Sequence, residues 1–350
     1  MNKIFKLILI ILHFSSMNSF KNIKNIKDNN IQKPIIFKEM INKPNNNNNN
    51  NNNNINYFVV KKNGFLKIIR SNCIAPTLLL SFTGGWIMNP SFMNLLHSPN
   101  FITSTIITNL IMSASMILND IYDINIDKIN NPNRPLITGE VSKKEAYLYI
   151  FLLLSSTQYL SLNYLPSNLQ TLIYFIIFEI NIYTPFLKKI LFVKNISCAL
   201  LVSFSLFFTG LASSNELLMV NKNFNLLIVA MNFIFFGSLS NEILLDIKDH
   251  EGDKENNINT LSTYFSKDFA WKFVNYVIYF NVAINSFYLG YLFNKNISML
   301  FIFIMLPQLI YLNIIKKNIY SSKSINEYMK YTNITLFIVL LYFCTVSLRI

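Results

Sequence analysis

Long apolar stretches, repeated along the chain, are the feature that most limits what this sequence can fold into. Only 13% of its 350 residues are charged and 52% are hydrophobic, which excludes an ordinary soluble domain. Each stretch approaches the roughly 20 residues that an α-helix needs to cross the hydrocarbon core of a bilayer. The sequence therefore predicts an all-α, polytopic membrane bundle of about nine transmembrane helices, at 72–91, 101–119, 146–164, 169–187, 195–214, 223–245, 269–292, 297–315 and 331–348.

The positive charges support this count of spans. Loops on the cytoplasmic side of a membrane protein carry an excess of Lys and Arg. With nine spans, the segments on one side hold most of these residues, whereas the short loops on the other side hold only Lys222 and Lys295. The net charge of +13 is thus mostly a topology signal, and no nucleic-acid partner is needed to explain it.

Two acidic runs lie at the ends of two predicted spans. The first acidic run, 119–127, is Asn-Asp-Ile-Tyr-Asp-Ile-Asn-Ile-Asp, and the second, 241–253, is Asn-Glu-Ile-Leu-Leu-Asp-Ile-Lys-Asp-His-Glu-Gly-Asp. If each helix continues through its run, spacings of three and four put the acids on one face. Crowded carboxylates repel and favour a cation, and oxygen ligands combined with phosphates suit Mg²⁺. The span count puts both runs on one side of the membrane, so we expect a single site for a Mg²⁺-bound diphosphate.

These runs resemble the two aspartate-rich motifs of the UbiA-type family of intramembrane prenyltransferases. The family's first motif, Asn-Asp-x-x-Asp-x-x-x-Asp, is matched by 119–127, and its second, Asp-x-x-Asp-x-x-x-Asp, by 246–253. The segment 133–142 is similar to the Arg-Pro-x-x-Ser-Gly-x-x-Ser segment of the plastid and archaeal branches, with Thr138 in place of Ser. The resemblance covers about 65–350.

The resemblance implies a transferase that moves a prenyl group from an isoprenoid diphosphate to a lipophilic or aromatic acceptor, with Mg²⁺ as cofactor, and releases diphosphate. It assigns catalytic roles to Asp123, Asp249 and Lys188. Diphosphate binding falls to four cations, Arg70, Arg134, Lys188 and Lys248. The implied metal ligands are Asn119, Asp120, Asp123, Asp127, Asp246, Asp249 and Asp253.

The acceptor stays open at this stage. The motifs are similar to those of branches that prenylate homogentisate, chlorophyllide or glyceryl phosphate ethers, and the sequence fixes neither the prenyl chain length nor the oligomeric state. Two other classes compete with an enzyme. A polytopic transporter would place its acids near span centres, and a non-catalytic membrane scaffold would not require the intact Asn and Asp pattern.

The first 64 residues differ from the rest in composition. Residues 1–20 have a short apolar core that is typical of a signal peptide, and 21–64 are basic and Asn-rich, which predicts disorder. The transmembrane prenyltransferase domain then covers 65–350. Such a two-part leader resembles those that direct proteins into plastids bounded by extra membranes. A mitochondrial or endomembrane location is the alternative.

Overall fold

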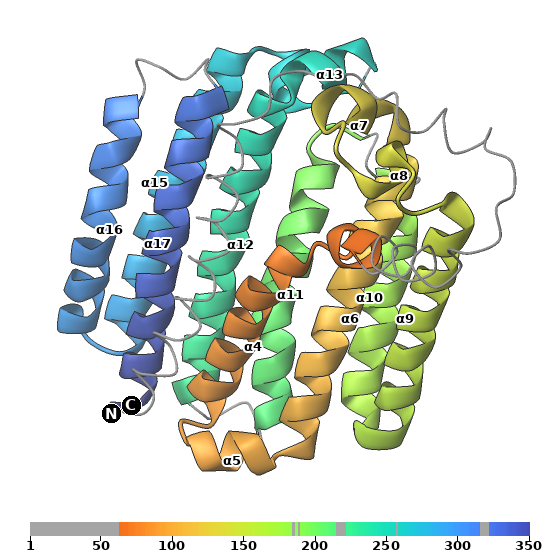
Figure 1. The fold of residues 1–350 in the computed structure, drawn as a ribbon. Coiled ribbons are helices and arrows are strands. Elements are labelled where there is room, and N and C mark those ends of the chain that lie inside the picture. The colour runs from red at the N-terminus through yellow and green to blue at the C-terminus, as the bar shows by residue number, and fades with distance from the viewer. Residues whose placement is uncertain (1–62, 184–185, 188–189, 215–221, 257, 316–321) are drawn as a thin grey trace, which may run out of the picture.

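The computed structural model describes residues 63–350, apart from 184–185, 188–189, 215–221, 257 and 316–321. All regular structure in these described residues is helical. Long helices overlap each of the predicted apolar stretches (Figure 1), and their bounds are α4 (Ile74–Met88), α6 (Pro99–Tyr122), α9 (Lys143–Tyr164), α10 (Ser167–Tyr183), α11 (Val193–Ser213), α12 (Lys222–Lys248), α15 (Lys267–Leu292), α16 (Lys295–Ile315) and α17 (Ser322–Ser347).

The predicted fold class, an all-helical membrane bundle, is confirmed, but the count of nine spans is not. Helix α4 has only 15 residues, fewer than an untilted crossing requires. Within the described residues, five helices are long and apolar enough to cross a membrane, namely Pro99–Tyr122, Val193–Ser213, Lys222–Lys248, Lys295–Ile314 and Ser324–Ser347. The exact number of crossings therefore stays a prediction.

Short helices close the two ends of the bundle. The helix α5 (Phe92–His97) lies at the lower end in Figure 1, while α7 (Ile124–Asn130), α8 (Pro135–Thr138) and α13 (His250–Glu255) lie at the upper end. The remaining short elements are η1 (Ser71–Cys73) and α14 (Leu261–Tyr264). Because α7 and α13 contain parts of the two acidic runs, both runs reach the same end, as the span count predicted.

The acidic runs are not continuous helices, which corrects our expectation from their spacing. Helix α6 ends at Tyr122 and α7 begins at Ile124, with Asp123 between them at φ −92° and ψ 7°. Asp249 separates α12 from α13 in the same way, at φ −90° and ψ 9°. Both aspartates occupy the sparsely populated bridge region of backbone space. Each span therefore bends at the middle aspartate of its run.

Small residues let α4 and α11 approach closely at the centre of the bundle. The Thr209 hydroxyl donates to the Ser81 carbonyl oxygen at 3.0 Å, and the Ser213 hydroxyl donates to the Gly85 carbonyl oxygen at 3.1 Å. A side chain at Gly84 would start 2.0 Å from the backbone oxygen of Leu206. Close packing and interhelical hydrogen bonds of this kind hold membrane helices together where lipid supplies little hydrophobic driving force.

We predict that Gly84→Ala destabilises the folded protein by about 3 kcal/mol, because the added methyl group meets backbone that cannot move aside. Thermal unfolding of the detergent-purified protein measures the change. Gly237→Ala is the control, since its methyl group would meet only the Asn281 amide at 4.0 Å. Equal melting temperatures for the two variants would contradict the close packing of α4 on α11.

The leader lies outside the described residues, except for its last two positions. Residues 63 and 64 are helical and belong to a helix described over 63–68, so disorder does not hold for the last two positions of the predicted tract. The predictions of a signal peptide at 1–20 and of a disordered tract at 21–64 otherwise stay predictions.

Candidate functional site

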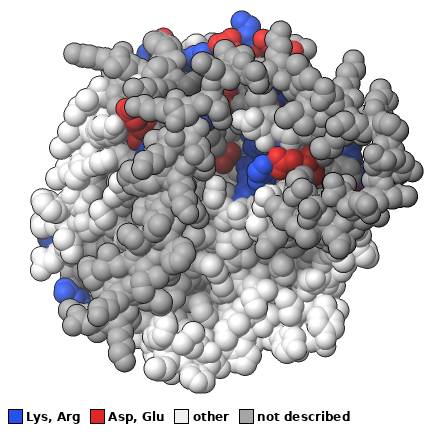
Figure 2. Space-filling view, in the orientation of Figure 1, with Lys and Arg blue, Asp and Glu red and all other residues white. Residues whose placement is uncertain are grey.

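One cavity of about 340 Å³ opens at the end of the bundle where the acidic runs meet. Its deeper wall is largely apolar and includes Leu80, Ile111, Leu201 and Phe204. Figure 2 shows charged atoms around a hollow in the upper half of this face, whereas most of the described surface below carries none. The cavity mouth is lined by most of the predicted site residues, namely Arg70, Asn119, Asp123, Asp127, Arg134, Asp246, Lys248, Asp249 and Asp253.

The bend in each span turns its acids toward this cavity. Across the first bend the backbone hydrogen bonds continue, because the Asp123 N–H donates to the Asn119 carbonyl at 3.0 Å and the Asp127 N–H to the Asp123 carbonyl at 2.7 Å. Asp123 and Asp127 are 8% and 5% exposed. The second run repeats this pattern, since the Asp253 N–H donates to the Asp249 carbonyl at 3.0 Å. Two similar acidic segments thus converge on one space.

Asp120 holds two arginines rather than facing the cavity. Its Oδ1 accepts from Arg70 Nη2 at 2.9 Å and forms a second ion pair with Arg134 Nη1. Asp120 is 1% exposed and is absent from the cavity wall, whereas both arginines line it. The predicted role of Asp120 as a metal ligand is therefore less favoured than a role in orienting these two guanidinium groups.

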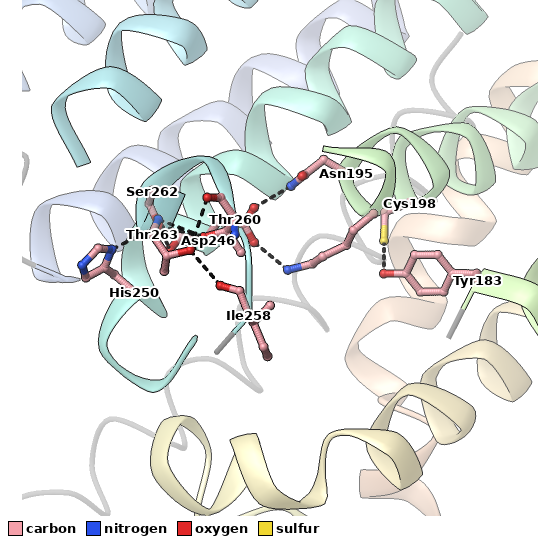
Figure 3. A network of polar contacts seen from close by, with 10 residues as sticks. Tyr183, Asn195, Cys198, Asp246, His250, Ile258, Thr260, Ser262 and Thr263 are labelled. Carbon is pink, nitrogen blue, oxygen red and sulfur yellow. Dashed lines mark hydrogen bonds and ion pairs between the residues drawn. The ribbon is translucent and has the colours of Figure 1, made fainter. Parts of the chain in front are cut away.

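In the second run Asp246 also pairs with a cation, although it lines the cavity. Lys194 Nζ donates to its Oδ1 at 2.6 Å and Asn195 Nδ2 to its Oδ2 at 2.7 Å. The Ser262 hydroxyl also donates to the Asp246 backbone oxygen at 2.8 Å, so α14 braces the end of α12 (Figure 3). Since both carboxylate oxygens have donors, Asp246 too is better suited to positioning a cation than to binding a metal.

Lys194 is a cavity cation that our predicted set of site residues did not contain. It lies at the start of α11, and its partner Asp246 is 52 residues further along the chain. Only its place among the lysines of the charge-rich loops could have suggested it. The predicted residue Lys188, by contrast, lies outside the described residues, so its position is not known.

The acids fit a divalent cation. Oδ2 of Asp127 is buried and accepts no hydrogen bond from the described residues. Burial raises the pKa of Asp127, although Arg134 and Asn131 oppose that shift, and burial likewise raises the pKa of Asp249. Bound Mg²⁺ would relieve both effects by neutralising the carboxylates.

The geometry also limits how a metal could be held. Among the described residues, no three His, Cys, Asp or Glu side chains are already gathered around one point. Mg²⁺ is commonly held by one or two carboxylates together with substrate phosphates. A pair of acids from each run, joined through a shared diphosphate, therefore fits better than a cage made of protein ligands alone.

Gly252 packs against the end of the Asn130 side chain. A methyl group at this position would lie 2.1 Å from Oδ1 of Asn130, which lines the cavity. We predict that Gly252→Ala lowers any metal-dependent activity on the order of 10-fold, because the Asn130 side chain must move and small displacements disrupt catalytic geometry. Gly290→Ala, with ordinary contacts from 3.4 Å, is the control. Equal activity of the two variants would show that the position of Asn130 is not critical.

Comparison with known proteins explains the paired acidic runs. Residues 77–341, well over half of the chain, match the sequence model of the UbiA prenyltransferase family. The chain belongs to this family. As a member of the UbiA prenyltransferase family it is an integral membrane prenyltransferase, which decides against the transporter and the scaffold.

Curated relatives of this UbiA-family chain include two archaeal enzymes. Digeranylgeranylglyceryl phosphate synthase of Sulfolobus acidocaldarius is 30% identical over 59% of this chain and 71% of its own length. The protein of the same name from Saccharolobus solfataricus is 27% identical over 77% of this chain and 93% of its own length.

Solved structures share the fold of this UbiA-family chain. A digeranylgeranylglyceryl phosphate synthase structure has a TM-score of 0.64 at 22% identity and covers 83% of this chain and 99% of that protein. A UbiA homolog from Archaeoglobus fulgidus, bound to GPP and Mg²⁺, has a TM-score of 0.56 at 19% identity, covering 82% of this chain and all of that protein. These likenesses establish the fold and leave the roles of individual residues to be argued from the site.

Proposed function

We propose that this UbiA-family protein transfers a prenyl group from a prenyl diphosphate to the free hydroxyl of a prenylated glyceryl phosphate, with Mg²⁺ as cofactor and diphosphate as the second product. The convergence of both acidic runs and four cations on the mouth of one apolar-walled cavity carries this proposal. Such a cavity suits a substrate with a doubly charged head and a hydrocarbon tail.

We propose separate roles for the acidic and the basic residues of the cavity. Asp120 and Asp246 orient cations, as their ion pairs suggest. Bound Mg²⁺ would supply positive charge to the diphosphate as the allylic C–O bond breaks. Arg70, Arg134, Lys194 and Lys248 line the same space and would stabilise the departing anion, as we predict for Lys188. The proposed metal ligands are Asn119, Asp123, Asp127, Asp249 and Asp253.

The curated relatives favour the glyceryl phosphate acceptor among the three that the motifs left open. The two described above are named digeranylgeranylglyceryl phosphate synthase, a product name with a glyceryl phosphate that carries two prenyl chains. The first acidic run and the segment 133–142 are compatible with that branch. We therefore place homogentisate and chlorophyllide second.

Incubation of the purified protein with Mg²⁺ and a labelled prenyl diphosphate tests the proposal. Farnesyl and geranylgeranyl diphosphate are the donors, and the acceptors are geranylgeranylglyceryl phosphate, homogentisate and chlorophyllide. We expect a labelled ether lipid that disappears when EDTA is added. If product forms only with homogentisate or chlorophyllide, the proposed glyceryl phosphate acceptor is refuted. If no acceptor gives product, the proposed function is refuted.

Plastid targeting remains a proposal, based on the two-part leader. The relatives described above are archaeal and give it no support. A fluorescent protein fused after residue 64 tests it by microscopy. Signal in mitochondria or in the secretory pathway would refute the plastid location without affecting the proposed reaction.

A further inference from the structure

Glu242 is a carboxylate in the cavity wall for which the proposed reaction has so far no role. It lies on α12, seven residues before the bend at Asp249, so its backbone lies about 10 Å deeper along the helix axis. Arg70, Lys194 and Asp246 are close enough for their charges to act on it.

Glu242 has no acidic counterpart in the first acidic run. Asp120, Asp123 and Asp127 correspond to Asp246, Asp249 and Asp253, with spacings of three and four residues in both sets. The position in α6 that corresponds to Glu242 is Met116, which also lines the cavity. At this depth the cavity is therefore apolar on the α6 side, whereas the α12 side carries an acid. A metal site shared by the two runs does not account for Glu242.

Cys198 contacts Glu242, and Tyr183 in turn contacts Cys198. Its carboxylate accepts a hydrogen bond from the Cys198 thiol. That thiol has a single proton, so the 3.0 Å contact between Tyr183 and Cys198 must be one in which the tyrosine hydroxyl donates to the sulfur. Figure 3 shows Tyr183 and Cys198 facing each other, and both side chains line the cavity. This chain fixes the carboxylate while leaving oxygen lone pairs for another donor.

Glu242 lies at the depth in the cavity where a base would meet the hydroxyl group of a bound acceptor. The acceptor oxygen attacks the allylic carbon from the side opposite the diphosphate, at about 3 Å from that carbon. A general base lies about 3 Å beyond the oxygen that it deprotonates. These two distances add up to about 6 Å. With the diphosphate between the two bends, its phosphate group and the allylic C–O bond add the remaining few ångströms to the depth at which Glu242 lies.

We infer that Glu242 is the general base of the transfer and takes the proton of the acceptor hydroxyl. The acceptor oxygen forms a bond to the allylic carbon, the bond from that carbon to the diphosphate oxygen breaks, and its electron pair leaves with the diphosphate. The hydroxyl proton passes to the Glu242 carboxylate. This inference rests on the proposed function.

The test compares Glu242→Gln with wild-type protein in two measurements. The first is Mg²⁺-dependent binding of a labelled prenyl thiolodiphosphate, an unreactive analogue of the donor, and the second is the rate of transfer to geranylgeranylglyceryl phosphate. We expect binding within twofold of wild type and transfer reduced at least about 100-fold. Glu179→Gln is the matched control, because Glu179 lies on α10 but does not line the cavity, and it should stay within twofold in both measurements.

Each outcome decides the inference. If Glu242→Gln keeps transfer within tenfold of wild type, Glu242 is not the general base. If the variant loses analogue binding together with transfer, Glu242 belongs to the metal site instead. Wild-type protein that transfers nothing would refute the proposed function itself. If formate partly restores transfer in Glu242→Ala, the role of Glu242 as general base is supported. If the variant still binds the analogue but formate restores no transfer, that role is contradicted.

Discussion

Asp123→Asn is expected to lower prenyl transfer by at least about 1,000-fold, or on the order of 4 kcal/mol of transition-state stabilisation. Asp123 lies at the bend between α6 and α7, is 8% exposed and lines the cavity mouth. Asparagine keeps its size and removes its negative charge, so the site loses attraction for Mg²⁺ where the diphosphate must be held. Transfer of label from a prenyl diphosphate to an extractable lipid measures the rate.

The control for this substitution lies in the second acidic run. Glu251 is fully exposed and forms an ion pair with Lys267 at 3.0 Å, away from the cavity wall. Glu251→Gln should keep wild-type activity, because exposed ion pairs contribute little. A folded Asp123→Asn protein that keeps more than a tenth of wild-type activity would show that the reaction does not depend on this carboxylate.

Lys194→Met has the second large effect, and we expect it on stability and activity together. The substitution leaves the Asp246 carboxylate, 1% exposed, without the ammonium group that lies 2.6 Å from it. Breaking a buried ion pair from one side costs about 3–5 kcal/mol, because the remaining charge is uncompensated. Transfer should also fall, since the cavity loses one of the cations proposed to stabilise diphosphate.

A double variant separates these two effects. Lys194→Met combined with Asp246→Asn removes both charges, so thermal unfolding should recover most of the lost stability. Transfer should remain low, because the cation is still missing. Recovery of both properties would mean that Lys194 serves only the fold, and recovery of neither would contradict the pairing with Asp246.

The sequence was sufficient to predict the bundle because the membrane imposes a simple pattern. Backbone groups must be satisfied within each span, so every long apolar stretch becomes a helix. The asymmetry of the lysines also predicted correctly that both acidic runs reach one end. Short spans are harder to delimit, since α4 ends at Met88, before its apolar stretch does.

The bends in the two acidic runs could not be predicted from local signals. Neither Asp123 nor Asp249 has a proline or glycine directly beside it. The partners of Asp120 and Asp246 were also hidden, because Arg70 and Lys194 come from distant parts of the chain. The resemblance therefore listed all six aspartates as metal ligands, and the separate roles proposed for Asp120 and Asp246 come from their partners in the structure.

The central claim is that the two acidic runs form a single Mg²⁺-dependent diphosphate site. Binding of a labelled prenyl thiolodiphosphate to Asp123→Asn and to Asp249→Asn, at fixed Mg²⁺, tests it most directly. We expect one analogue per chain in the wild-type protein and loss of nearly all binding in either single variant. If each variant keeps about half of the bound analogue, the runs are two separate sites and the account is wrong.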